Sequence, residues 1–336
     1  MKKISILLVM FVSVFSCLLV GCGKKDNNTI RISEVTHSLF YAPLYVAMNN
    51  GYFKDEGLKI ELTNAGGSDT VMSSLISNSA DVGLMGPESC VYVRNNGMKN
   101  APVIFAQLTA CDGSFLVGRE NESTNFDWQN LKGKHIIAGR KGGMPAMTLQ
   151  YILEKNYGLT TGAEISSTID VKLDTTIAFN LTTSSFVAGT GDYCTMFDPT
   201  ASQCEIEQTG YIVSALGDEV KDVPYTCFVA TNNYLNKNGD KLEKFIRALK
   251  KGYNYLINAT DAQVISSLKP SFSTTSDELI LASVKNYIRI GAYASSFELK
   301  ESSWNNMLDI IDNAGELKAR VDWNDAINNS FAKNIA

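Results

Sequence analysis

The chain has 336 residues, of which 45% are hydrophobic and 19% charged, so it is long enough to form two globular domains or lobes. The formal net charge is −5, and no basic cluster stands out beyond Lys132, Lys134, Arg140 and Lys141. This balance excludes a nucleic-acid-binding protein, and no nucleic-acid partner is expected.

The N-terminus has the features of an export signal. Lys2 and Lys3 precede the apolar run ILLVMFVSVFSCLLV, which is too short to be a spanning helix with polar flanks of its own. We therefore predict a signal peptide over residues 1–21 and a polar tether over residues 22–28.

The end of this segment, LVGCG, resembles the lipobox of bacterial lipoproteins, with Cys22 as the residue that receives lipid. Lipid on Cys22 would hold the protein at the cell membrane, on its extracytoplasmic face. The alternative is a plain secretory signal that is cut nearby.

Short β-prone runs alternate with helical patterns over the next hundred residues. The strands are predicted at TIRISEV, LKIEL, ADVGLMG, VIFAQLTA and SFLVGR, and helices at YAPLYVAMNNGYF, at TVMSSLISN and after PES. Ser68 or Asp69 is expected to cap the second helix. This alternation predicts a parallel α/β arrangement, in which the loops after the strands meet at one edge of the sheet.

The stretch IIAGRKGGMPAMTLQY, residues 136–151, runs from a strand through glycines into a helix that starts near Pro145. Its spacing fits neither a P-loop nor a dinucleotide fingerprint. A helix that begins there directs unpaired N–H groups towards Gly142 and Gly143, which suits an anion or a polarised oxygen. The alternative is a tight turn with a solvated Arg140.

No catalytic or metal-binding motif is found. G-x-S-x-G, H-E-x-x-H and C-x-x-C are all absent, and His37 and His135 are the only histidines. A lone histidine is more often structural or a ligand contact than a base. Without Cys17 and Cys22, five cysteines remain, so at least one thiol is free; disulfides cannot be assigned. We expect no metal and no cofactor.

Four segments together resemble a known family: HSLFYAPLYVAMNNGYFKDEGLKIEL, GGSDTVMSSLISNSADVGLMG, LKGKHIIAGRKGGMPAMTLQY and FVATNNYLNKNGDKLEKFIRAL. They are similar to solute-binding proteins of ABC importers for nitrate, sulfonate, taurine and thiamine-pyrimidine precursors. The resemblance spans roughly residues 30–335. It implies an α/β, two-lobed periplasmic-binding-protein fold of type II, with two crossing hinge strands and the ligand in the interlobe cleft.

The resemblance also implies an organisation and partners. One lobe would comprise residues 29–114 and 224–336, and the other residues 115–223. The LTACDGSFLVGR and VPYTCFVAT segments would be the two crossings. The partners would be a small-molecule ligand, an ABC transporter permease and, through Cys22, the membrane, and we expect a monomer.

Ligand contacts are implied by position in three groups. The first lobe would contribute His37, Phe40, Tyr41, Gly66, Gly67, Ser68, Gly86, Pro87 and Glu88. The second would contribute Arg140, Lys141, Gly142, Gly143, Met144, Phe197 and Asp198. Asp112 lies at the end of another predicted strand. Aromatic rings and carboxylates favour a heterocyclic ligand, such as a vitamin or pyrimidine precursor, over a simple sulfonate or nitrate.

Two other classes stay open. The same superfamily includes a thiamine-pyrimidine synthase that uses pyridoxal phosphate, and HSLFYAPLY resembles it. The cysteine-dense motif expected of that enzyme is missing, because GDYCTMFDP holds only Cys194. A sensor or adhesin lipoprotein could also use the fold without transport. We expect a binding protein and no enzyme.

Overall fold

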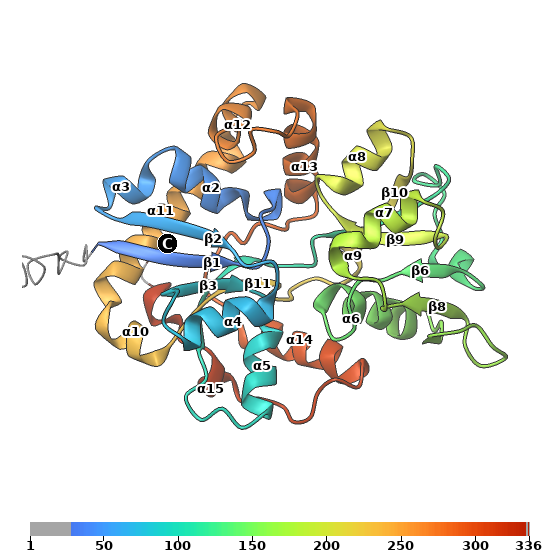
Figure 1. Cartoon of the computed structure of the whole chain (residues 1–336), viewed down its shortest axis with the longest axis horizontal. Helices are drawn as coiled ribbons and strands as arrows, with labels where there is room; N and C mark the ends of the chain where they lie inside the picture. Colours follow the sequence, from blue (N-terminus) through green and yellow to red (C-terminus); the bar gives the residue numbers. More distant parts are fainter. Residues whose placement is uncertain (1–27, 334, 336) are drawn as a thin grey trace, which may run out of the picture.

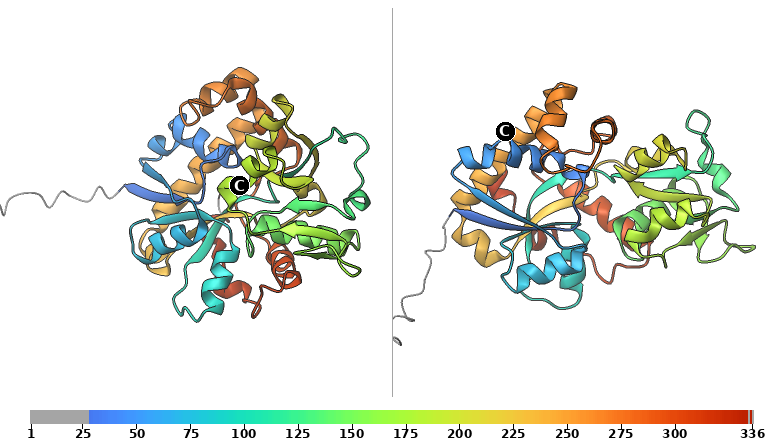
Figure 2. Two further views of the ribbon diagram at one scale, coloured as in Figure 1. Left: turned by 45° about the vertical axis from the view of Figure 1, so that its right-hand side comes forward. Right: turned by 45° about the horizontal axis from the view of Figure 1, so that its top comes forward.

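The computed structural model describes residues 28–333 and 335 of the chain. The predicted signal peptide and Cys22 lie outside these residues. Two sheets, each covered by helices, form two lobes side by side along the long axis (Figures 1 and 2). Among the described residues, no helix is long and apolar enough to cross a membrane.

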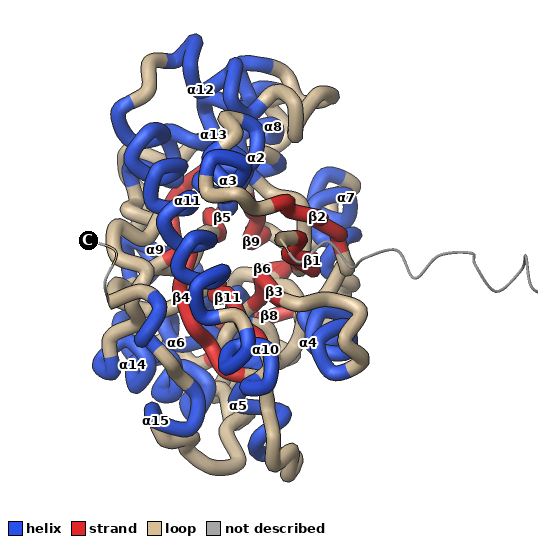
Figure 3. Tube along the Cα trace, turned by 90° about the vertical axis from the view of Figure 1, so that its left-hand side faces the viewer, coloured by secondary structure: helices blue, strands red, loops and turns tan. Residues whose placement is uncertain are grey.

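The first lobe contains a five-stranded sheet in the order β2-β1-β3-β11-β4. Its strands are β1 (Thr29–Glu34), β2 (Lys59–Asn64), β3 (Val82–Met85), β4 (Val103–Thr109) and β11 (Thr226–Ala230). Strands β3, β4 and β11 are entirely buried, in keeping with their continuous apolar sequences. Figure 3 shows these strands surrounded by helices.

The second lobe contains a six-stranded sheet in the order β10-β5-β9-β6-β8-β7. Its strands are β5 (Ser114–Gly118), β6 (His135–Ile137), β7 (Thr161–Gly162), β8 (Val171–Asp174), β9 (Tyr193–Phe197) and β10 (Tyr211–Ala215). The chain enters this sheet after β4 and returns to the first sheet at β11. These two connections are the crossings between the lobes.

Both sheets are mixed, so the prediction of a parallel arrangement was wrong in part. Strand β1 runs parallel to β2 and β3, and β6 runs parallel to β8 and β9. Strand β11 is antiparallel to β3 and β4, and β5 is antiparallel to β9 and β10. The physical reason is connectivity: β5 and β11 each enter their sheet from the other lobe rather than through a βαβ unit.

Helices follow the strands in both lobes. Those of the first lobe are α2 (Ala42–Asn49), α3 (Tyr52–Asp55), α4 (Ser68–Ile76), α5 (Glu88–Asn95), α10 (Asn232–Lys237), α11 (Gly239–Asn258), α12 (Asp261–Leu268), α13 (Asp277–Arg289), α14 (Glu301–Asn313) and α15 (Trp323–Ala326). Those of the second are α6 (Met144–Tyr151), which continues as a π-helical turn over Ile152–Asn156, α7 (Thr182–Val187), α8 (Thr200–Ile206) and α9 (Leu216–Glu219).

Most helix starts match their sequence signals, and one does not. Helix α6 begins beside Pro145 with Gly143 at its N-cap, as its sequence predicts. Neither Ser68 nor Asp69 caps α4, because the chain turns at Gly66, with φ +73°, and the helix starts directly after an extended Gly67. Asp69 therefore lies in the first turn, where its charge suits the helix dipole.

The core of the first lobe depends on a close contact between α2 and α11. Buried residues of α11 recur at helical spacing, and Gly252 on this face lies against α2. A Cβ at Gly252 would collide with the Pro43 carbonyl oxygen and approach the Ala47 Cβ to 2.9 Å. Only glycine allows the two helices to approach this closely.

We therefore expect Gly252→Ala to lower the free energy of unfolding by about 1 to 3 kcal/mol, because overpacking moves a helix rather than a flexible side chain. Gly239→Ala is the matched control, since its Cβ would meet only Phe331 Cε1 at 3.6 Å. Denaturant unfolding of both variants checks the difference. Equal stabilities would show that α2 and α11 adjust freely.

Candidate functional site

Polar side chains with no partner gather where the two lobes meet. Within the described part of the chain, Glu88 Oε2, Asp112 Oδ2, Thr148 Oγ1 and the Tyr225 hydroxyl are buried without a hydrogen bond. Buried polar atoms are normally paired, because an orphan costs about 1 to 3 kcal/mol. We therefore take this group of unpaired atoms as the candidate ligand site.

The four residues come from four different parts of the fold. Glu88 opens helix α5 of the first lobe, and Thr148 lies in α6 of the second. Asp112 lies between β4 and β5, in the first crossing, and Tyr225 directly precedes β11, in the second. We call Glu88, Asp112, Thr148 and Tyr225 the interlobe cluster. Any rotation of one lobe against the other changes the distances within it.

Asp112 is held rigidly by one of its two oxygens. Oδ1 accepts hydrogen bonds from the Ser114 amide, at 2.7 Å, and from the Ser114 hydroxyl. The hydroxyls of Thr148 and Tyr225 lie near enough to influence the acid, yet neither meets the geometry of a hydrogen bond. Burial outweighs these neighbours and raises the pKa of Asp112 to about 6. Oδ2 is the free acceptor.

Glu88 is the second buried carboxylate, with 7% of its surface exposed. Burial raises its pKa to about 7, and the more distant charge of Arg140 acts in the opposite direction. Burial, followed by the charges of Asp112 and Glu88, also raises the pKa of Tyr225 well above its usual value. Tyr225 thus lies within electrostatic reach of both carboxylates.

The Glu88 carboxyl group folds back over Gly86, where an added Cβ would overlap both of its oxygens. We expect Gly86→Ala to displace this carboxylate and to weaken ligand binding at least tenfold while the protein still folds, because the obstacle is a side chain rather than backbone. Calorimetry and circular dichroism check the two parts. Unchanged affinity would show that the Glu88 carboxylate does not contact the ligand.

Aromatic rings form one wall of the cluster. The Phe40 ring lies 5.8 Å from that of Tyr225, 5.7 Å from that of Phe197 and 5.0 Å from that of Tyr287. Phe40 is fully buried, and a Cβ at Gly113 would strike its ring, so it packs the crossing tightly. Tyr41 is buried as well, close to Glu88 and Thr226.

Other predicted contacts have partners inside the protein. His37 is bound on both sides, by Glu34 Oε1 at 2.9 Å and by the Ser271 carbonyl oxygen at 2.9 Å. Asp198 accepts from Ser202 and Asn286, and its amide donates to the Tyr287 hydroxyl at 2.9 Å. Asp198 therefore joins α8 of the second lobe to α13 of the first.

The glycine-rich turn also bridges the lobes. The Tyr92 hydroxyl donates to the Gly142 carbonyl oxygen at 2.9 Å, and Arg140 Nη1 lies 3.9 Å from Asp69 Oδ1. Lys141 is exposed and faces Glu316 at 3.8 Å. Gly142 needs its positive φ of 71° for this turn, whereas Gly143 is extended. The first two of these contacts join residues of the two lobes.

The remaining predicted residues divide by burial. Pro87 is buried at the N-cap of α5, directly before Glu88, and Met144 is buried at the start of α6, which carries Thr148. Gly66 is exposed, and Gly67 and Ser68 are partly exposed. Thr148 and Tyr225 were not predicted. Thr148 was detectable as the polar residue on an otherwise apolar helix face, but Tyr225 gave no signal beyond a β-prone run.

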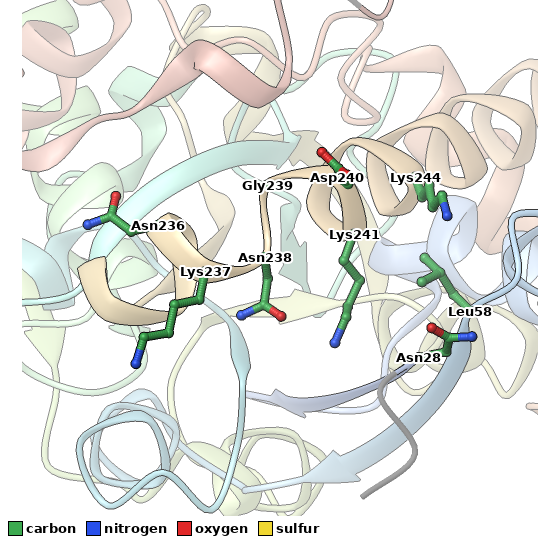
Figure 4. Close-up of a pocket in the computed structure, with 9 residues that line it drawn as sticks. All are labelled: Asn28, Leu58, Asn236, Lys237, Asn238, Gly239, Asp240, Lys241 and Lys244. Carbon is green, nitrogen blue, oxygen red and sulfur yellow. The ribbon is translucent and has the colours of Figure 1, made fainter.

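The described residues also form a hollow that is unrelated to the interlobe cluster. It lies on the first lobe at the start of α11, and Figure 4 shows its lining of Asn28, Leu58, Asn236, Lys237, Asn238, Gly239, Asp240, Lys241 and Lys244. All of these come from one lobe, so lobe closure cannot cover a ligand there. It contains no predicted site residue.

The described cysteines form no disulfide, and no candidate metal group is found among the described residues. Cys90, Cys111, Cys194, Cys204 and Cys227 are all buried free thiols, so the structure contains no disulfide among them. Across the described residues, no group of three or more His, Cys, Asp or Glu side chains could hold a metal ion.

Comparison with known proteins identifies the family. Residues 40–262 match the family model described as NMT1/THI5 like. The "Putative binding protein YtlA" of Bacillus subtilis (strain 168) is 38% identical over 318 residues, which cover 94% of this chain and 93% of that protein. A 4-amino-5-hydroxymethyl-2-methylpyrimidine phosphate synthase of Aspergillus parasiticus is 26% identical over 228 residues, which cover 65% of this chain and 63% of the enzyme.

Solved structures identify the fold. The periplasmic aliphatic sulphonate binding protein SsuA from Escherichia coli superposes with a TM-score of 0.69 at 14% identity, covering 92% of this chain and 98% of that one. The predicted α/β periplasmic-binding-protein fold is thus confirmed. The chain belongs to the NMT1/THI5-like family.

Proposed function

We propose that this protein is the solute-binding protein of an ABC importer. It captures a small molecule between its lobes and delivers it to a permease. The observation that carries the proposal is the interlobe cluster, in which both lobes and both crossings supply a buried polar atom with no partner. The 38% identical relative, whose name describes a binding protein, and the fold shared with SsuA support it.

We take residues 29–114 with 224–336 as one lobe and residues 115–223 as the other. Closure brings Glu88 and Thr148 together, and the contacts of Tyr92, Arg140 and Asp198 between the lobes stabilise the closed state. A ligand on the cluster excludes water, so that each of its hydrogen bonds counts for more. The permease would recognise this closed state.

Export and anchoring complete the proposal. Cys22 would carry lipid, and the protein would act as a monomer on the extracytoplasmic face of the cell membrane. Cys22→Ala is expected to abolish membrane retention without a change in the unfolding curve, because the tether precedes the first strand. Fractionation and mass spectrometry of the N-terminus check this; a lipid-bearing, membrane-bound variant would contradict it.

A heterocyclic ligand with ring amino groups is favoured over a simple sulfonate, taurine or nitrate. Phe197, Tyr41 and Tyr225 offer aromatic faces, where stacking adds about 0.5 to 1.5 kcal/mol beyond area burial. Glu88 and Asp112 offer free acceptors. Arg140, whose side chain is 64% exposed, is a weaker candidate contact.

Synthesis of a thiamine pyrimidine with pyridoxal phosphate is the second candidate, on the strength of the Aspergillus parasiticus relative. The residues fit that cofactor poorly, because its phosphate would meet two buried carboxylates. The charged residues at the rim, Arg140 and Lys141, are exposed and face acidic partners. Binding without catalysis agrees better with this charge balance.

A thermal-shift panel tests the proposal. Ligand at 100 times its dissociation constant adds about 2.7 kcal/mol of stability. We expect pyrimidines or related amino heterocycles at millimolar concentration to raise the melting temperature. Stabilisation by taurine or an alkylsulfonate alone would show that the ligand is a sulfonate rather than a heterocycle. Stabilisation by pyridoxal phosphate with a new absorbance near 400 nm would favour the thiamine-pyrimidine synthase.

A further inference from the structure

The charges around the interlobe cluster point to the electrical character of the ligand. We infer that the ligand binds as a cation, with at least two N–H donors that engage Glu88 Oε2 and Asp112 Oδ2. This rests on the proposed function and adds to it: an amino heterocycle could be neutral, whereas the cluster selects one that is positively charged when bound.

The buried charge of the interlobe cluster is negative and has no buried positive partner among the described residues. Glu88 and Asp112 are 7% and 2% exposed, and no lysine or arginine side chain is buried in the described part of the chain. Arg140 is the cation whose charge acts on Glu88. Its side chain is 64% exposed, and its Nη1 lies 3.9 Å from Asp69 Oδ1. Burying a carboxylate without a partner costs several kcal/mol per ion. A bound cation removes this cost, whereas an anion would add a third negative charge.

The two free carboxylate oxygens, Glu88 Oε2 and Asp112 Oδ2, each require a hydrogen-bond donor from the ligand. The two free oxygens belong to different elements, α5 and the first crossing, and the Tyr225 hydroxyl lies within electrostatic reach of both. An amidine, an aminopyrimidinium or a similar flat cation offers two N–H groups on a rigid frame. The tyrosine and threonine hydroxyls can then accept or donate as required.

Other buried carboxylates differ from Glu88 and Asp112 because both of their oxygens have hydrogen-bond partners. Asp198 also lies between the lobes, but both of its carboxylate oxygens have partners, Ser202 and Asn286. Glu34 likewise uses both oxygens, on His37 and Tyr45. Glu88 and Asp112 are therefore set apart, since each keeps one oxygen for which no protein donor meets hydrogen-bond geometry, although the Thr148 and Tyr225 hydroxyls lie near Asp112.

The test uses the full chain and a small-molecule extract divided by ion exchange. Fractions retained by a cation exchanger, fractions retained by an anion exchanger and the unretained fraction are each added to the protein, and the melting temperature is measured. We expect only the cation-exchange fraction to stabilise it. Glu88→Gln and Asp112→Asn should each weaken that effect at least tenfold in a titration, and Glu120→Gln, an exposed acid in the loop after β5, should not.

Benzamidine and benzenesulfonate provide a matched pair of flat probes with opposite charge. Benzamidine should stabilise the wild-type protein more than benzenesulfonate does. A stabilising anion-exchange or unretained fraction, with benzenesulfonate at least equal to benzamidine, would overturn the charge inference and leave the solute-binding function in place. No stabilisation by any fraction would overturn both.

Discussion

The double variant Glu88→Gln, Asp112→Asn is expected to bind its ligand about 10² to 10⁴ times more weakly than the wild-type protein. Each substitution keeps the shape of the side chain but replaces a charged acceptor by a neutral amide. A hydrogen bond to a charged group contributes about 1.5 to 3 kcal/mol, and two are lost. Calorimetry with the stabilising ligand measures the difference.

The unliganded double variant is expected to be more stable than the wild type at pH 8, because two buried carboxylates without full pairing have been neutralised. Measuring stability as well as affinity distinguishes the loss of ligand contacts from a general weakening of the fold. If Glu88 and Asp112 served only to hold the fold together, the variant would lose stability instead. Glu120→Gln, an exposed acid in the loop after β5, is the control for both measurements and should alter neither.

The unliganded wild-type protein is expected to lose stability as the pH rises from about 4 to about 7. The pKa of Glu88 is raised from 4.5 to about 7, and that of Asp112 from 3.8 to about 6, in both cases by burial. A raised pKa means that the folded state binds protons more tightly than the unfolded chain. Its contribution is therefore complete below the unfolded pKa and is lost as the pH rises through the folded value.

The size of this loss is at most roughly 3 kcal/mol for each group, from 1.36 kcal/mol per pKa unit. His37, whose pKa is raised mainly by its hydrogen bond to Glu34, changes stability in the same direction at higher pH. The double variant retains His37 and loses the contribution of both acids, so the comparison isolates them. Urea unfolding at several pH values is the measurement, and parallel profiles for the two proteins would contradict the assignment.

Much of the fold could be predicted because local signals agree with it. Strands β3 and β4 follow from their apolar runs, β1 from its β-branched residues in alternation with polar ones, and α6 from the glycines and Pro145. Strand direction could not be predicted for β5 and β11. Their sequences are those of buried strands in general, and only the passage of the chain from one lobe to the other makes them antiparallel.

The site was predictable in part for the same reason. Glu88 and Asp112 follow strand ends, where α/β proteins bind ligands, so their positions in the sequence point to a site. Tyr225 becomes their neighbour because the chain returns between the lobes more than a hundred residues later. His37 looked like a ligand contact, yet both of its ring nitrogens are used by Glu34 and Ser271, a pairing across 234 residues for which the sequence carries no local signal.

The most direct test is to identify what the protein binds. The full-length wild type and the Glu88→Gln, Asp112→Asn variant would be exposed to the same small-molecule extract, desalted and denatured, and the released molecules identified by mass spectrometry. We predict one small molecule with basic nitrogen from the wild type and none from the folded variant. Release of nothing from the wild type, or of the same molecule in equal amount from both proteins, would contradict ligand binding at the interlobe cluster.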